Sequence, residues 1–408
     1  CAFWGSRSLG RPNDRILLTF TIYPFLVIFD LDLDRVRNRP GIKWERHGDD
    51  VLCAWVADMD LEVPEFITNA VIERINSGGL GYGFYDEPIP VLEAFRDRMR
   101  NAFDWRVEVS EIIRVHDVIQ GLELVLDTLV PPGAGVVVQT PVYPPFYSSI
   151  EGVGRRWVAN PLVEMETGWS LDFEHLESVA SQQDVSALLL CHPHNPSGFV
   201  MDKTDLAQVI EIADRHDLLV ISDEIHCDLV YAPNEHLPTA SISELAAQRT
   251  VTLIAATKTF NMAGLRMAFV HTASEKYLPS LQQIRPRMIG GINGLGQVAT
   301  VAGWEHGDAW LSELVAGLDR NRHLLGELLN DYLPAVHYRL PEATYLAWLD
   351  CRELGLGDDP AEIFLAQNKV ALSSGPDFGI EGLGYVRLNF ATSPKMLQMI
   401  VERMAQVS

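Results

Sequence analysis

The chain has 408 residues, of which 47% are hydrophobic and 21% are charged, and its formal net charge at pH 7 is −23. This length and composition are those of a globular protein with a large core and more than one compact unit. The acidic balance argues against a nucleic-acid partner, because nucleic acids bind basic surfaces. It does not exclude anionic small molecules, since a few local cations can bind them against the overall charge.

The N-terminal part of the sequence contains an apolar run, residues 16–29, that follows Arg11 and Arg15. This run superficially resembles the hydrophobic part of a signal peptide. However, it contains Pro24, is too short to span a bilayer and continues into an acidic stretch without an A-x-A cleavage site. We interpret residues 1–28 as an appended extension that packs on the body or on a partner chain, or as an artefact of the start-site assignment, and we expect no membrane association.

From about residue 60 onward, helical periodicity alternates with short aliphatic runs. Five strands are predicted, at Gly135–Gln139, Ala187–Cys191, Leu218–Ser222, Val251–Ala255 and Met267–His271. These runs are apolar on both faces, as the strands of a parallel sheet are. Helical periodicity lies between several of them, for example at 202–216. The pattern therefore predicts an α/β fold, with a mostly parallel sheet between helices in a large domain at 61–290.

The pattern changes near residue 290. A glycine-rich joint at 290–296 precedes a long helical stretch that continues through Asn330. Two further predicted strands, Thr344–Asp350 and Tyr385–Ala391, and a terminal helix follow. We interpret residues 291–408 as a linker helix and a smaller α+β domain.

The cysteines of the sequence are odd in number, widely spaced and without a CxxC pair. A disulfide framework or a zinc knuckle is therefore not expected. Small buried side chains in a reducing, cytoplasmic compartment fit this usage better. The five residues are Cys1, Cys53, Cys191, Cys227 and Cys351.

Polar or aromatic residues follow four of the predicted strands, at the end where open α/β sheets bind ligands. In chain order they are Tyr143, Asn195, Asp223 and Lys258. This set suits pyridoxal phosphate (PLP). Its aldehyde needs a lysine amine, its ring nitrogen needs a buried carboxylate, and its phenolic oxygen needs a hydrogen-bond donor. The aromatic side chain offers a face on which the PLP ring can stack.

Seven motifs extend this pattern along the chain. They are KWE at 43–45, WVADMD at 55–60, PVYPPF at 141–146, HPHNPSG at 192–198, SDEIHCDLVY at 222–231, TKTFNMAGL at 257–265 and a glycine-rich frame at 375–391. With these motifs in this order, the chain resembles the class I/II aminotransferase superfamily of PLP-dependent, fold-type I enzymes. Within it, the cystathionine β-lyase or C–S lyase branch is the most similar. The resemblance runs from about Phe29 to the C-terminus, and it implies that residues 29–60 pack on the small domain and the active site.

The resemblance assigns roles to the residues that follow the strands. Lys258 would form the Schiff base with the cofactor and act as general acid and base. Asp223 would pair with the ring nitrogen, Asn195 would donate to the phenolic oxygen, and Tyr143 would stack on the ring. His226 would lie near the phenolic oxygen. Structural alternatives stay open for each: a surface lysine, a helix cap, a turn residue, simple ring packing and a core histidine.

The resemblance also suggests how the cofactor phosphate would be bound. Thr257 would offer its hydroxyl, and Arg266 would pair with the dianion. Backbone N–H groups would come from a turn that enters a helix, at Ile119, Gln120 and Gly121.

Four further residues complete the expected site. Tyr82 resembles the tyrosine that reaches the phosphate of the neighbouring subunit, which implies a homodimer; a loop aromatic is the alternative. Arg387 would hold the substrate α-carboxylate, unless it forms a structural ion pair. Trp55 and Ala57 would contact the substrate.

The implied activity is β-elimination on cystathionine or a related cysteine S-conjugate, which yields a thiol, pyruvate and ammonia. An aminotransferase with the same residues remains open, although a dicarboxylate transaminase would want a second arginine that the sequence does not identify. A PLP-binding regulatory protein is a further alternative. The glycine-rich stretch at 78–83 does not read GxGxxG, and HExxH and EF-hand spacings are absent from the sequence. We therefore expect neither a nicotinamide cofactor nor a catalytic metal.

Overall fold

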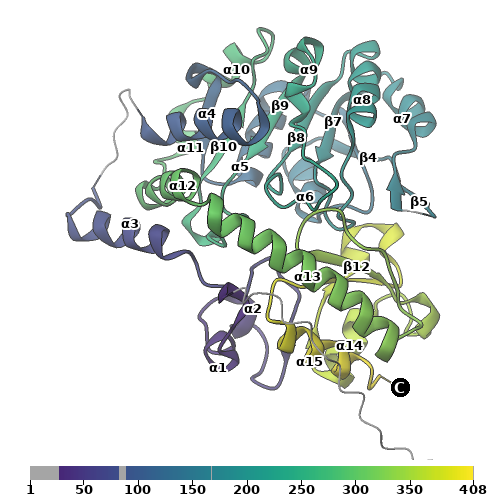
Figure 1. Cartoon of the computed structure of the whole chain (residues 1–408). Coiled ribbons are helices and arrows are strands. Elements are labelled where there is room, and N and C mark those ends of the chain that lie inside the picture. The colour runs from purple at the N-terminus through teal and green to yellow at the C-terminus, as the bar shows by residue number, and fades with distance from the viewer. Residues whose placement is uncertain (1–26, 82–88, 167, 408) are drawn as a thin grey trace, which may run out of the picture.

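The computed structural model describes residues 27–81, 89–166 and 168–407. The chain forms two bodies, and the long helix α13 (Asp308–Tyr332) runs between them (Figure 1). The proposed extension therefore lies outside the described residues up to residue 26, as does Tyr82. Among the described helices, none combines the length and the apolar character that crossing a membrane requires.

The larger body is built on a seven-stranded sheet with the strand order β2-β10-β9-β8-β7-β3-β4. Its strands are β2 (Ile112–Val115), β3 (Gly135–Val138), β4 (Arg156–Ala159), β7 (Val185–Cys191), β8 (Leu219–Asp223), β9 (Thr250–Ile254) and β10 (Ala268–His271). Neighbours from β4 to β9 pair in parallel. The predicted mostly parallel sheet is thus confirmed, whereas β2 and β4 were not predicted.

The strand β10 corrects one expectation, because it is antiparallel to both β9 and β2. It is buried on both faces, so its side-chain pattern is the same as that of a parallel strand. Its direction follows from its connection to β9. That connection holds only the short 3-10 turn η4 (Ala263–Leu265), whereas a parallel return usually needs a crossover helix.

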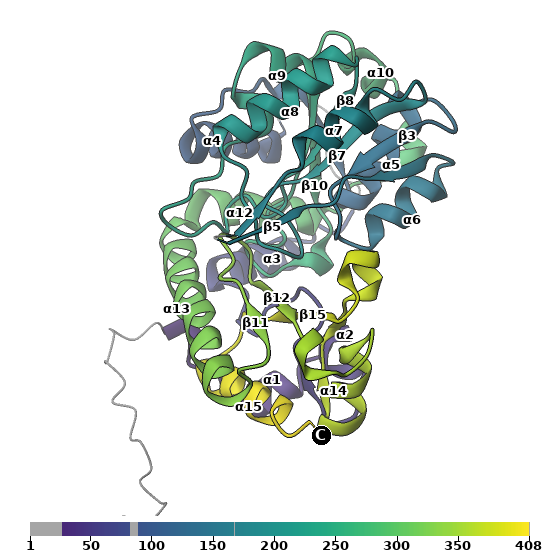
Figure 2. The same cartoon turned by 90° about the vertical axis from the view of Figure 1, so that its right-hand side faces the viewer.

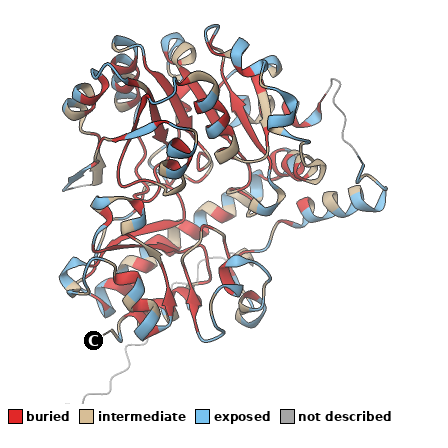
Figure 3. Cartoon of the chain, turned by 180° about the vertical axis from the view of Figure 1, so that it is seen from behind, coloured by how far each residue is buried: buried red, intermediate tan, exposed pale blue. Residues whose placement is uncertain are grey.

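Helices cover both faces of this sheet, and alternate strand residues pack against opposite faces. Val136 and Val138 join the core beneath α5 (Val118–Leu129), whereas Val137 joins the core beneath α8 (Lys203–Arg215). Figure 3 shows the resulting pattern of buried strands between helices with exposed outer faces. The other helices of the larger body are α3 (Glu65–Asn76), α4 (Pro90–Phe103), α6 (Pro145–Gly152), α7 (Phe173–Ala180), α9 (Glu244–Arg249), α10 (Leu278–Gln282), α11 (Pro286–Ile289) and α12 (Gly294–His306). A hairpin, β5 (Val163–Met165) and β6 (Gly168–Ser170), projects from it.

The smaller body contains an antiparallel sheet with the order β11-β12-β15-β14. Its elements are β11 (His337–Tyr338), β12 (Leu346–Asp350), β14 (Ser373–Ser374), β15 (Tyr385–Asn389), α14 (Pro360–Asn368) and α15 (Pro394–Met404). The N-terminal segment, with α1 (Leu33–Arg37), α2 (Ile42–Glu45) and β1 (Leu52–Cys53), lies in the same body (Figure 2). Its strand β1 pairs in parallel with β13 (Val370–Ala371). Residues of the N-terminal segment and of the C-terminal part therefore share one hydrophobic core.

The helical stretch that follows the glycine-rich joint is two helices rather than one. It breaks at Gly307, where an added Cβ would lie 2.2 Å from the carbonyl oxygen of Gly303 and 2.5 Å from the Phe260 ring. The first helix, α12, packs with α4 in a hydrophobic cluster of the larger body. α12 therefore packs with the larger body, and α13 is the helix that runs between the two bodies.

Candidate active site

The carboxyl ends of four neighbouring strands carry the residues singled out in the sequence. Asp223 is the last residue of β8, and Asn195 lies four residues after the end of β7. Lys258 and Tyr143 follow β9 and β3. Asp223 is close enough to Lys258 for the two charges to interact, and the charge of Asp223 also affects the pKa of Tyr143. The sheet therefore brings these four side chains to one rim.

Lys258 binds to the N-terminal segment. Its Nζ donates a hydrogen bond to the carbonyl oxygen of Ala57 at 2.8 Å. Burial lowers the pKa of Lys258, while Asp58 raises it and Arg387 lowers it further. A lowered pKa favours the neutral amine, which is the form that acts as nucleophile or as general base.

Asp223 is buried and has no cationic ion-pair partner among the described residues. Its Oδ1 accepts a hydrogen bond from the N–H of Ile225 at 3.1 Å. Burial raises the pKa of Asp223 to about 7, with the Ile225 hydrogen bond opposing this rise and Glu224 adding to it. A carboxyl group in this environment would be stabilised as an anion by a cation placed beside it.

Arg387, on β15, is only 5% exposed, and no carboxylate of the described chain lies within ion-pair distance of it. Its Nη1 donates to Asn195 Oδ1 at 3.0 Å, and its Nη2 donates to the Trp55 carbonyl oxygen at 3.0 Å and to Ser373 Oγ at 3.1 Å. Its Nε is buried without a partner in the described structure. Burial lowers the pKa of Arg387 to about 10. A buried guanidinium held only by neutral groups is suited to bind an anion.

The hydrogen bond from Arg387 also orients the Asn195 amide. Because Oδ1 accepts from the guanidinium, the Nδ2 group remains as a donor for a ligand oxygen. The neighbouring His226 is 3% exposed, and its Nδ1 has no partner among the described residues. Burial, with Lys258 and Arg387 adding to the effect, lowers the pKa of His226 to about 3. The imidazole is therefore neutral. Burial raises the pKa of Tyr143, which favours the neutral form of that side chain as well.

The groups expected to bind the cofactor phosphate, called the phosphate cradle below, are the N–H groups of residues 119–121 and the side chains of Thr257 and Arg266. The structure agrees with this expectation only in part. The N–H of Gln120 donates to Asp117 Oδ1 at 2.8 Å, and the N–H of Gly121 donates to the Asp117 carbonyl oxygen at 3.0 Å. Both groups are thus occupied within the chain. The Asp117 side chain caps the N-terminus of α5 at Gln120, and the Gly121 N–H makes the regular helical bond to the residue four positions earlier. A Cβ on Gly121 would lie 3.1 Å from Val270, so this glycine serves the packing of α5 on the sheet. The N–H of Ile119 has no acceptor in the described structure.

Two side chains complete the proposed cradle. Arg266 forms an ion pair with Asp117 Oδ2 and is largely exposed. Thr257 is buried, and the structure describes no hydrogen bond of its hydroxyl. Arg266 and the predicted N–H groups therefore lie at the N-terminus of α5, but an acidic side chain, Asp117, lies among them.

Several residues near the site were not singled out as ligand contacts from the sequence. Ser373 Oγ donates to the Trp55 carbonyl oxygen at 2.7 Å, and Tyr345 Oη donates to that of Ala57 at 2.8 Å. Asn389 Nδ2 donates to the carbonyl oxygens of Val56 at 2.8 Å and Asp58 at 2.7 Å. One signal was available for Asn389, because it lies two residues after Arg387 and therefore on the same side of β15.

Asn261 has a related role, since its Nδ2 donates to the carbonyl oxygens of Met59 at 3.0 Å and Leu61 at 2.8 Å. Its backbone is left-handed, with φ of 53°, a conformation that asparagine adopts more readily than most residues. Together with Asn389, it ties the segment that carries Ala57 to both bodies.

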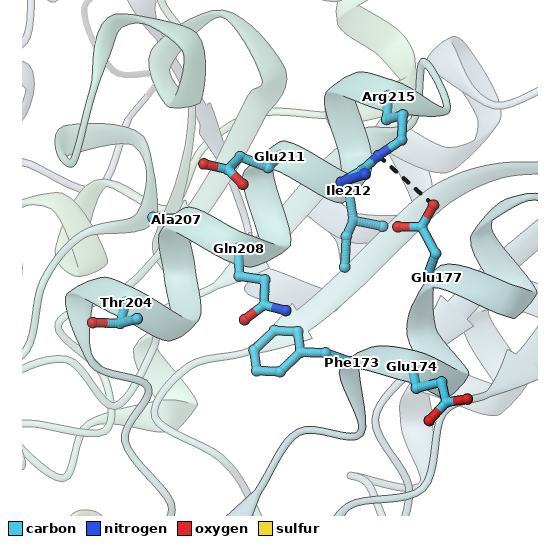
Figure 4. A pocket seen from close by; sticks show the side chains of 9 residues that line it. All are labelled: Phe173, Glu174, Glu177, Thr204, Ala207, Gln208, Glu211, Ile212 and Arg215. Carbon is cyan, nitrogen blue, oxygen red and sulfur yellow. Dashed lines mark ion pairs between the residues drawn. The ribbon is translucent and has the colours of Figure 1, made fainter.

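A cavity of about 640 Å³ lies away from this site, between α7 and α8 (Figure 4). Its charged lining includes Glu174, Glu211 and the ion pair Arg215–Glu177. None of the residues proposed for the site lines it. The cavity is therefore separate from the chemistry described above.

An α/β sheet with a lysine, a carboxylate and an amide at its carboxyl rim and an arginine from a second body is the arrangement expected of a PLP enzyme of fold type I. Comparison with known proteins agrees. The model of the family described as aminotransferase class I and II matches residues 60–404, and the chain belongs to this family.

The similarity to individual proteins extends over most of the chain. Cystathionine beta-lyase PatB of Bacillus subtilis is 36% identical over 381 residues, which cover 90% of this chain and 97% of PatB. The PLP-bound C–S lyase from Staphylococcus hominis has a TM-score of 0.87 at 27% identity, with 93% of this chain and 98% of that chain covered. Cystalysin from Treponema denticola, whose structure contains pyridoxal 5'-phosphate, has a TM-score of 0.86 at 28% identity, with coverage of 91% and 96%.

Proposed function

We propose that the chain is a PLP-dependent carbon–sulfur β-lyase that cleaves cystathionine or a related cysteine S-conjugate to a thiol, pyruvate and ammonia. The observation that carries the proposal is the buried Arg387, which lacks a carboxylate partner in the described chain and lies beside the rim that holds Lys258 and Asp223. The similarity to PatB and to the C–S lyase of Staphylococcus hominis supports the β-lyase reaction.

The residues present fit PLP. The Asp223 carboxyl, with its raised pKa, offers a counter-ion for the ring nitrogen, and the Asn195 Nδ2 offers a donor for the phenolic oxygen. The Ile119 N–H and the Arg266 guanidinium offer an anion site for the phosphate. When bound, PLP would act as an electron sink for the electron pair left on the substrate α-carbon.

The chain's own residues then account for binding and proton transfer. Arg387 would bind the substrate α-carboxylate in a bidentate manner and so fix the orientation of the α-carbon. Lys258, with its lowered pKa, would take the α-proton as a neutral amine. The thiolate leaves from the β-carbon with the electron pair of the broken C–S bond, and the proton held by Lys258 Nζ is available to it. Water then completes the conversion of the remaining three-carbon unit to pyruvate and ammonia.

The arginines of the chain support this reaction over transamination of a dicarboxylic amino acid. The other buried arginines of the described residues, Arg155 and Arg322, pair with Asp127 and Asp319. Arg320 also has buried guanidinium nitrogens without a partner in the described chain, but its guanidinium packs on the ring of Phe29, in the core of the smaller body.

The test is to incubate the purified, PLP-loaded protein with L-cystathionine in the absence of any 2-oxo acid and to measure pyruvate. A β-lyase releases pyruvate over many turnovers. An aminotransferase stops after one turnover and resumes only when a 2-oxo acid is added, which would refute the proposal. In Lys258→Ala, we expect pyruvate release to fall at least about a thousandfold, because the group that moves the proton is lost.

We further propose a homodimer in a reducing, cytoplasmic compartment. The exposed Ile72 and Ile75 on α3 and Leu80, just before Tyr82, support an apolar contact with a second subunit. The four cysteines that the structure describes are buried and unpaired, which fits a reducing compartment. Tyr82 would then reach the phosphate of the neighbouring active site.

A further inference from the structure

The proposed phosphate cradle contains an acidic side chain that has no role in holding an anion. Asp117 Oδ1 accepts from the N–H of Gln120 at 2.8 Å, and Asp117 Oδ2 forms an ion pair with Arg266 Nη1. The first two N–H groups of α5, at Val118 and Ile119, have no acceptor in the described structure. The Asp117 carboxylate thus lies at the positive end of the helix and also pairs with Arg266, the cation that the phosphate would use.

We propose that Asp117 is an internal competitor of the cofactor phosphate, which lowers the affinity of this chain for PLP. In the cofactor-free protein its carboxylate neutralises Arg266 and the N-terminus of α5. When the phosphate binds, Arg266 is shared with it or transferred to it, and two anions then lie at one helix end. This inference rests on PLP as the cofactor of the proposed function, and it does not depend on which reaction the loaded protein performs.

The charge of Asp117 is not needed for its structural role. Asparagine caps helices about as well as aspartate, because capping needs only a side-chain oxygen that accepts an N–H. The backbone position of Arg266 is fixed independently of the ion pair. Its backbone is left-handed, with φ of 44°, and the preceding carbonyl oxygen, of Leu265, accepts from Asn293 Nδ2 at 2.6 Å. Replacing the carboxylate by an amide should therefore keep the cradle and remove the competing charge.

The test is a titration of cofactor-free Asp117→Asn with PLP, followed by the visible absorbance of the bound cofactor. We expect the Kd for PLP to fall about five- to tenfold relative to wild type, as for removal of one neighbouring like charge near a protein surface. Pyridoxal, which lacks the phosphate, should bind both proteins equally. Asp172→Asn is the matched control, because Asp172 caps α7 in the same way, accepting from the N–H of His175 at 2.9 Å.

A second readout uses inorganic phosphate alone. Phosphate should raise the midpoint of thermal unfolding more in cofactor-free Asp117→Asn than in wild type or Asp172→Asn. In an Arg266→Gln background the gain from Asp117→Asn should shrink, because the release of the guanidinium no longer contributes.

An unchanged or higher Kd for PLP in Asp117→Asn would overturn the inference, as would an equal gain for pyridoxal or a gain that is undiminished by Arg266→Gln. Absence of PLP binding in wild type and in both variants would overturn the inference and the proposed cofactor together. A variant-specific failure with normal PLP binding by wild type would leave the proposed function intact. The two kinds of failure are therefore distinguishable.

Discussion

Asp223 shows how burial prepares a single carboxyl group for a cationic partner. In the cofactor-free protein, its pKa is raised from 3.8 to about 7, chiefly by burial. Below the unfolded-state pKa, the group is neutral in both states and costs nothing. As the pH rises toward 7, the native state retains a proton that the unfolded chain has lost, so the free energy of unfolding falls over this range.

Asp223→Asn should remove this loss of stability. We expect the cofactor-free variant to be more stable than wild type at pH 8 by on the order of 1–4 kcal/mol, and the difference should disappear near pH 4. Urea unfolding of both cofactor-free proteins at the two pH values measures this. A difference that does not change with pH would contradict the assignment of the raised pKa to this side chain.

Ser373 is a second residue whose effect should be local. Its hydroxyl lies between the Trp55 carbonyl oxygen and Arg387 Nη2, so Ser373→Ala removes one hydrogen bond from the guanidinium. We expect the KM for the amino-acid substrate to rise about two- to tenfold with a smaller change in kcat, which steady-state kinetics would show. Ser374→Ala is the control, because the Ser374 hydroxyl donates to Asp359 instead. Equal effects of the two substitutions would argue against a positioning role.

At the residue scale, the candidate site residues could be predicted mainly from their position directly after a predicted strand. Asp223 and Lys258 were predicted because each follows an aliphatic run that could be read as a strand. Ser373 was not, because it meets Arg387 only across the pairing of β14 with β15. The cap that the Asp117 side chain places on the Gln120 N–H was also missed. Whether a helix N-terminus is open or capped depends on the rotamer of one side chain, which the sequence does not give.

Among the elements, the N-terminal segment contributes to the site through the carbonyl oxygens of Trp55 and Ala57, which accept from Arg387 and Lys258. Asn389→Ala would remove one of two donors from each of the buried carbonyl oxygens of Val56 and Asp58. The other donors, the Asp58 N–H to Val56 and Lys43 Nζ to Asp58, would remain. We expect a loss of about 1–3 kcal/mol in the free energy of unfolding and a fall of kcat/KM of about tenfold or more as the segment loosens.

Asn321→Ala provides the matched control for this prediction. Asn321 is equally buried, and its Nδ2 donates to the carbonyl oxygens of Phe390 and Thr392, which lie outside the segment. Chemical unfolding should show a similar loss of stability for both variants, whereas kinetics should show a large effect only for Asn389→Ala. If both variants lose the same activity, the effect is one of stability alone.

Strands and helices could be predicted where the hydrophobic pattern is compatible with only one kind of element. The runs at 187–191 and 218–222 became β7 and β8, and the capped helix α8 begins one residue after Asp202, within the stretch predicted as helical. The direction of β10 and the break at Gly307 could not be predicted in this way. Both depend on tertiary contacts, namely strand pairing and the approach of the Phe260 ring.

For the whole molecule, the proposed homodimer leads to a test by complementation. Lys258→Ala and Tyr82→Ala should each be nearly inactive as homodimers. If Tyr82 serves the neighbouring site, a heterodimer of the two has one site with both wild-type residues. Mixing the variants under conditions of subunit exchange should therefore restore activity, to about half of the wild-type value per heterodimer at most. Absence of any restored activity in a heterodimer verified by mass would place Tyr82 in its own subunit's site.

The pairing of β1 with β13 has a consequence for how the protein is made. A ribosome releases the N-terminal segment first, but the strand on which it pairs emerges only after the whole larger body has been synthesised. The larger body can fold during translation, whereas the core shared by the two chain ends cannot. The carbonyl group that Lys258 contacts is therefore placed late, and a nascent chain cannot hold an assembled active site before β13 has been synthesised.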